Sequence, residues 1–144
     1  MKQAVLSLDI EDWFHLDYFQ RERCDQSYSL LDGVENYVSL IESLELKSSF
    51  FVLGELADSL GPRLKDLHNR GHDVGCHGWS HRRPLTMSLP EFEQDLAMSK
   101  QAVCAASGQE QIGYRAPCFS LDRARLDKVA EAGFVYDSSL IDFG

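Results

Sequence analysis

Short apolar runs alternate along this chain with segments that have the periodicity of a helix, and this alternation constrains the fold most. Five runs are strand-like: Gln3–Asp9, Ser48–Leu53, His72–Cys76, Ile112–Ala116 and Phe134–Tyr136. Helical patterns fill the intervals between them, over about 34–44, 62–69, 89–108 and 122–132. The sequence therefore predicts an α/β fold with a parallel sheet, either open and doubly wound or part of a barrel.

Local signals mark where several of these segments begin and end. Ser88 and Glu91 have the spacing of a capping box at the start of a helix. Pro62 is expected in the first turn of another helix, which Arg70 and Gly71 would end. Residues 11–33 are aromatic, charged and irregular, and a loop of that length in a compact domain is usually functional.

Polar residues fall at the carboxyl ends of the predicted strands. Asp9, His77, Arg115 and Asp137 all lie at or just beyond such an end. Because α/β folds place their active sites there, we expect these side chains to lie near one another.

The acidic balance of the chain limits its partners. Fourteen Lys and Arg residues against 23 Asp and Glu residues give a net charge of −9 over 144 residues. We expect no nucleic-acid partner, because such binding needs a positive face, and no membrane insertion, because no apolar run approaches about 20 residues. The four cysteines are scattered and the chain starts without a signal-peptide pattern, so we expect one domain, reduced thiols and a cytoplasmic location.

Two histidines four residues apart, His77 and His81, follow the third predicted strand. This spacing can direct both imidazoles at one metal ion, although a capped turn with exposed histidines has the same spacing. Asp9, Glu11 and Asp12 place three carboxylates within four positions, which costs free energy unless a cation or an arginine offsets the charge. Arg115 offers the rigid fork that orients a carboxylate.

Taken together and in this order, these motifs resemble those of the NodB-homology polysaccharide deacetylases, carbohydrate esterase family 4. Residues 6–13 are similar to the first motif, in a variant with Asp-x-Glu-Asp followed by aromatics. Residues 71–81 (GHDVGCHGWSH) are similar to the second motif, and 113–117 to the third, Arg-x-Pro. The resemblance runs from residue 3 to about 139, nearest to the branch with exopolysaccharide-cluster deacetylases and the metal-independent allantoinases.

The resemblance implies a fold and a set of roles. The fold would be the N-terminal part of a distorted (β/α)7 barrel of the glycoside hydrolase/deacetylase type, with residues 1–144 forming one catalytic domain. His77 and His81 would bind one divalent metal, for which zinc fits best and cobalt, nickel and iron are alternatives. Asp9 would be the catalytic base, Arg115 would tether it, and the backbone N–H of Cys118 would stabilise the oxyanion.

The chain departs from the family pattern in two places. Ile10 separates the first two carboxylates, so either Glu11 or Asp12 is the third metal ligand; strand alternation favours Glu11, and a turn at Ile10 would make Asp12 equally suitable. The family also supplies a general acid from a later Leu-x-His segment, and no histidine follows His81. We therefore expect a chain truncated at its C-terminus.

Three functions follow as hypotheses. The first is a metal-dependent hydrolase that removes N-acetyl groups from N-acetylhexosamine units of a polysaccharide, such as an exopolysaccharide or a peptidoglycan precursor. The second is a metal-independent, allantoinase-like hydrolase of a cyclic amide, which retention of His77 and His81 disfavours. The third is a truncated, non-catalytic remnant that binds metal or carbohydrate. The sequence leaves the particular polysaccharide, the metal and the oligomeric state open.

Overall fold

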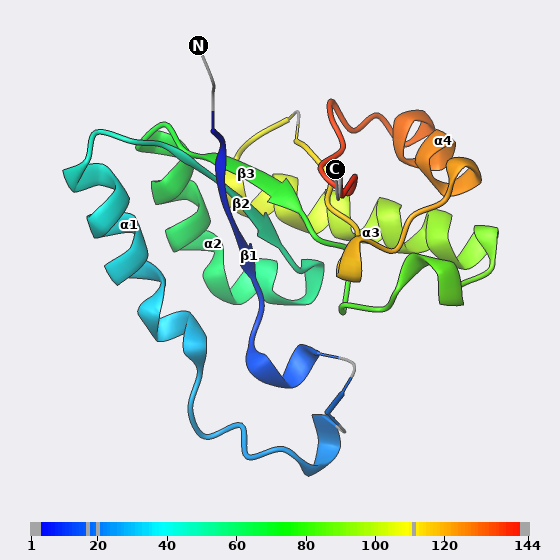
Figure 1. Ribbon diagram of the computed structural model, residues 1–144, viewed down its shortest axis with the longest axis horizontal. Coiled ribbons are helices and arrows are strands. Elements are labelled where there is room, and N and C mark those ends of the chain that lie inside the picture. The colour runs from blue at the N-terminus through cyan, green and yellow to red at the C-terminus, as the bar shows by residue number, and fades with distance from the viewer. Residues whose placement is uncertain (1–3, 17, 20, 111, 142–144) are drawn as a thin grey trace.

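The computed structural model describes residues 4–16, 18–19, 21–110 and 112–141. Three parallel strands, β1 (Leu6–Ile10), β2 (Ser48–Val52) and β3 (Asp73–Cys76), form a sheet in the order β1-β2-β3. Four α-helices accompany it (Figure 1): α1 (Val34–Ser43), α2 (Gly54–Asn69), α3 (Leu89–Ser107) and α4 (Arg123–Glu131). The predicted α/β class with a parallel sheet is confirmed over the described residues.

The two sides of the sheet differ in what they bury. Phe50, Val74 and Tyr114 point into a continuous apolar core with the inward faces of the helices, where α2 and α3 pack against each other and both contact β3. Figure 1 shows α2 and α3 behind the strands. Phe51, which follows Phe50, faces the other side and lies under the guanidinium of Arg115. Strand alternation thus separates a packed face from a face that carries polar side chains.

The fourth and fifth predicted strands are shorter than expected. Ile112–Ala116 pairs only around Tyr114, which bridges Cys76, and Phe134–Tyr136 is replaced by one bridge at Asp137, just beyond it. Each bridge still follows the parallel direction, so both segments continue the sheet beyond β3. Pro117 begins a short 3-10 turn three residues after the bridge at Tyr114, and a proline has no N–H with which to extend the pairing.

Some element bounds also differ from expectation. β1 begins at Leu6 rather than Gln3, which lies outside the described residues, and β3 begins at Asp73 rather than His72. α2 begins at Gly54, so the prediction that Pro62 occupies the first turn was wrong. The helix start has no side-chain cap to mark it, and Pro62 is exposed, as is Asp58, whose carbonyl would have been its hydrogen-bond partner.

The predicted start and end of α3 are confirmed. The capping box at the start of α3 forms, and the helix ends at Gly108 with a left-handed φ of 77°. The described residues between 11 and 33 form an irregular segment with three short 3-10 turns, η1 (Trp13–His15), η2 (Arg21–Arg23) and η3 (Leu30–Gly33). Within the described residues, none of the helices has both the length and the apolar character that crossing a membrane requires.

Candidate metal centre

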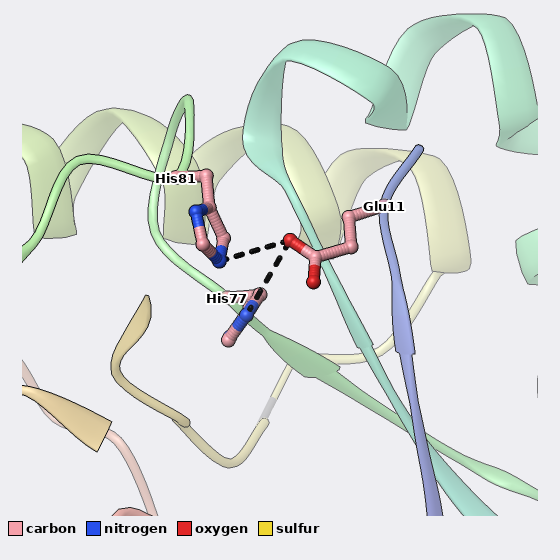
Figure 2. Close-up of side chains that lie close together, drawn as sticks. All are labelled: Glu11, His77 and His81. Atoms are coloured by element: carbon pink, nitrogen blue, oxygen red, sulfur yellow. Dashed lines mark ion pairs between the residues drawn. The ribbon is translucent and has the colours of Figure 1, made fainter. Parts of the chain in front are cut away.

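The carboxyl ends of β1 and β3 bring Glu11, His77 and His81 together. Glu11 follows the last residue of β1, and His77 follows the last residue of β3. The chain then turns through Gly78, with a φ of 75°, to His81, with a φ of 63°. Figure 2 shows the carboxylate and the two imidazoles directed at one another.

The three side chains are close and largely withdrawn from solvent. Glu11 Oε2 lies 3.0 Å from His81 Nε2 and 4.0 Å from His77 Nε2. The side chains of His77 and His81 are only 2% and 3% exposed, and that of Glu11 is 18% exposed. Glu11 Oε2 is buried, and within the part of the chain that the structure describes its contact with His81 does not have the geometry of an ordinary hydrogen bond. A buried oxygen in this state is one that a cation would satisfy.

The donor set suits a divalent metal. Among the residues that the structure describes, these three form the group of His, Cys, Asp and Glu side chains that could hold an ion, with donor atoms within 4.8 Å of one another. Bonds of about 2 Å place the donors of a tetrahedral zinc roughly 3 to 3.5 Å apart, so small side-chain adjustments would complete the arrangement. The residues present therefore fit the metal that the sequence suggested.

The protonation of the site favours ligation. His77 Nδ1 lies 2.8 Å from the carbonyl oxygen of Arg115, so Nδ1–H donates and Nε2 turns its lone pair to the centre. Burial lowers the pKa of His77, which keeps the imidazole neutral. Burial alone would raise the pKa of Glu11, but the contact with His81 lowers it overall. A neutral imidazole and an ionised carboxylate are the forms that bind metals.

Asp9 lies beside this group and is held by Arg115. One guanidinium nitrogen donates to Asp9 Oδ1 at 2.9 Å, while Asp9 Oδ2 lies 3.7 Å from His77 Nε2. The guanidinium also donates to Ser7 Oγ at 3.0 Å and to Ser138 Oγ at 2.8 Å. These contacts leave one Asp9 oxygen facing the centre, as a general base there requires.

Asp12 does not join the group. Its Oδ1 accepts from the backbone N–H of Leu30 at 2.8 Å, and its Oδ2 accepts from Ser29 Oγ at 2.5 Å. Asp12 also begins η1, where its backbone N–H donates to His15 Nδ1. The two alternatives for the carboxylate ligand thus separate: Glu11 faces the histidines, and Asp12 fastens the loop.

Cys118 lies in η5 (Pro117–Phe119), shortly after the Arg115 carbonyl that contacts His77. Its φ of 53° and the φ of 54° at Phe119 make an unusual pair of left-handed residues. The Cys118 side chain is exposed and lines a pocket of about 520 Å³, together with Asp137 and Ser139. The role of its N–H toward an oxyanion stays a prediction.

Several residues that support the centre had no role in the sequence analysis. Ser7 lies two residues before Asp9 on the same strand face, so strand alternation could have identified it. Ser138 directly follows Asp137, which the sequence analysis placed just beyond a strand end. Asp95, which accepts from the backbone N–H of Trp79, is one polar residue of a helix and carries no local signal.

The other three histidines lie outside this group of metal-donor side chains. His15 is buried, with Nε2 3.1 Å from Glu55 Oε1. His72 is buried and bonded to Ser48 N and to Glu42, whereas His68 is exposed on α2.

Known proteins are similar to this chain in sequence. Residues 25–136 match the family described as polysaccharide deacetylase. The chain is 28% identical over 109 residues to the peptidoglycan deacetylase of Helicobacter pylori, an alignment that covers 76% of this chain and 37% of that protein.

Solved structures share the fold. A candidate polysaccharide deacetylase from Mycobacterium smegmatis superposes with a TM-score of 0.81 at 24% identity, covering 95% of this chain and 50% of that one. A CE4 family pseudoenzyme from Bacillus anthracis gives a TM-score of 0.73 at 15% identity, covering 92% and 41%. This chain thus spans half or less of the length of each of these proteins.

Proposed function

The chain belongs to the polysaccharide deacetylase family, and from this premise we propose that it contributes the metal-binding and base-carrying part of a hydrolase that removes N-acetyl groups from N-acetylhexosamine units of a polysaccharide. The observation that carries the proposal is the convergence of Glu11, His77 and His81 beside an Asp9 that Arg115 holds. The three described strands and two bridges are, in this proposal, the first part of a (β/α)7 barrel.

The side chains divide the chemistry between them. Glu11, His77 and His81 would hold one divalent ion, with zinc as the best fit to the donor set and cobalt, nickel or iron as alternatives. When bound, such an ion supplies the acidity that activates water and polarises the acetamide carbonyl. Asp9 then accepts the proton of the attacking water at its oxygen that faces the centre.

Arg115 and Cys118 would complete this half of the site. Arg115 fixes the direction of the Asp9 carboxylate, because its rigid guanidinium donates to Asp9 Oδ1. The backbone N–H of Cys118 would donate to the oxygen that becomes negative as the carbonyl is attacked. The substrate is proposed from the family and from the peptidoglycan deacetylase relative.

Metal analysis tests the centre. Purified protein should hold about one equivalent of zinc or a similar ion, and His77→Ala with His81→Ala should remove it. His68→Ala is the matched control, because that histidine is exposed on α2 and is not one of the proposed metal ligands. Wild-type protein that binds no divalent metal would contradict the proposal.

Acetate release tests the activity. The natural form of the protein is incubated with oligomers of N-acetylglucosamine, and the release of acetate is measured. Asp9→Asn should lower kcat by about 100-fold or more, the usual contribution of a general base. A binding-only role is the second candidate, favoured by the shared fold with a pseudoenzyme. Metal binding without acetate release would support that second candidate.

A further inference from the structure

The segment that carries both histidines has a backbone that must be held in place. Gly78 and His81 both have positive φ values, 75° and 63°. Residues other than glycine rarely adopt this conformation, and it persists at functional sites only where the surroundings determine it. What holds residues 77–81 therefore decides whether the two imidazoles stay directed at Glu11.

Backbone groups hold the first part of the segment. His77 N donates to the carbonyl of Val52 at 2.8 Å, at the end of β2. The first two N–H groups of α2 donate to the carbonyls of Gly78 and Trp79, at 2.8 and 3.1 Å. These bonds hold the carbonyl groups of Gly78 and Trp79 in place. The N–H of Trp79 takes no part in them and needs a different acceptor.

The acceptor is the carboxylate of Asp95 on α3. Trp79 N lies 3.1 Å from Asp95 Oδ1 and 3.3 Å from Oδ2. A Cβ on Gly78 would lie 3.2 Å from Asp95 Oδ1, so the glycine also allows the carboxylate to approach. Asp95 is largely buried, and this burial raises its pKa to about 6. Burying a carboxylate costs free energy, and such a cost is retained where the hydrogen bond serves the site.

We propose that Asp95 is a positioning residue for the metal centre: by accepting from Trp79 N–H it holds the turn between His77 and His81 in the conformation that directs both imidazoles at one ion. The inference rests on the proposed metal-dependent function. Asp95 touches neither histidine in the contacts described, and it acts through the backbone of Trp79.

Cobalt binding tests the inference directly. Metal-free wild type, Asp95→Ala and Asp95→Asn are titrated with Co²⁺ and followed by visible absorption, with zinc competition for affinity. Asp95→Ala should weaken affinity by about 10- to 100-fold, the usual effect of removing a group that orients a ligand, and should change the intensity of the cobalt bands. Asp95→Asn should stay within a few-fold of wild type, because its amide oxygen still accepts.

Two further variants make the result decisive. Glu93→Ala removes an exposed carboxylate from the same helix and should leave binding unchanged. Asp95→Leu fills the space without an acceptor and replaces Asp95→Ala if that variant does not fold. Wild-type affinity and spectrum in Asp95→Ala or Asp95→Leu would overturn the inference, as would equal losses in the Ala and Asn variants. Wild type that binds no metal would instead overturn the proposed function.

Discussion

The two halves of the candidate centre are held by different means. The histidines come from residues 77–81, directly after a buried strand, whereas Glu11 begins the long irregular segment 11–33. Cys76, His77 and Gly78 are buried, but Tyr18, Tyr28 and Leu30 are 77%, 55% and 60% exposed. The segment that carries the histidines is therefore part of the core, and the segment that begins at Glu11 is attached to that core.

Side-chain contacts attach the acidic segment. Asp12 binds Ser29 and Leu30 across 17 and 18 residues, which closes the loop on itself. Glu55 on α2 meets both His15 at 3.1 Å and Arg21 at 2.7 Å. Among the described residues these are side-chain contacts and not sheet or helix hydrogen bonds, so the segment can loosen while the sheet and helices remain folded. The position of Glu11 therefore depends on a less stable region than the positions of the histidines do.

The largest expected effect separates the core from the segment. Phe92 on α3 is fully buried with its ring 6.3 Å from that of Tyr114, so Phe92→Ala should lower the free energy of unfolding by about 3–5 kcal/mol. Phe19→Ala removes a ring that is 44% exposed and should cost less than about 1 kcal/mol. Urea unfolding followed by circular dichroism measures both. Equal losses would mean that the segment belongs to the core.

The free energy of unfolding should depend on pH through Asp95, which contacts the segment that carries the two histidines. Burial raises the pKa of Asp95 from 3.8 to about 6. The hydrogen bond from Trp79 N–H and the charge of Arg82 oppose this shift with smaller effects. Cys76 and Tyr114 are the other titratable groups near Asp95. A carboxyl whose folded pKa is raised stabilises the fold below its unfolded pKa, and this stabilisation is lost as pH rises through the folded pKa. The window is therefore about pH 4 to 6.

Asp95→Asn isolates this dependence. The free energy of unfolding of wild type relative to Asp95→Asn should fall between pH 4 and pH 6 by at most about 3 kcal/mol. Chemical unfolding at several pH values measures the difference, which cancels the other titrating groups. A difference that stays constant, or that rises with pH, would show that Asp95 is not buried as described.

The sequence predicted the histidine side better than the acidic side, for a physical reason. Buried strands and capping boxes have short-range signatures, so the strand ending before His77 and the start of α3 at Ser88 could both be predicted. The choice between Glu11 and Asp12 depends on whether Ser29 and Leu30 fold back onto the loop. Strand alternation favoured Glu11, but nothing within a few residues of position 12 shows that the loop binds Asp12.

The same limit explains what was missed. The start of α2 at Gly54 has no side-chain cap, so a search for capping residues passes over it. Asp95 reaches Trp79 across 16 residues, and Arg115 reaches Ser7 across 108. Contacts of this kind are products of the topology, and only the residue types at their ends are visible in the sequence.

The smallest effect tests how the acidic segment is fastened. Asp12→Ala leaves the N–H of Leu30 without its acceptor and should lower the free energy of unfolding by about 2 kcal/mol. Hydrogen exchange at the Leu30 amide should accelerate by more than exchange in β2, because the loop opens before the sheet does. Asp25→Ala is the matched control, since that exposed carboxylate accepts from Ser27 within its own turn and its loss should change stability by less than about 0.5 kcal/mol. Equal acceleration in β2 and at Leu30 would show that the segment opens only with the whole fold, and the difference between the two halves of the centre would disappear.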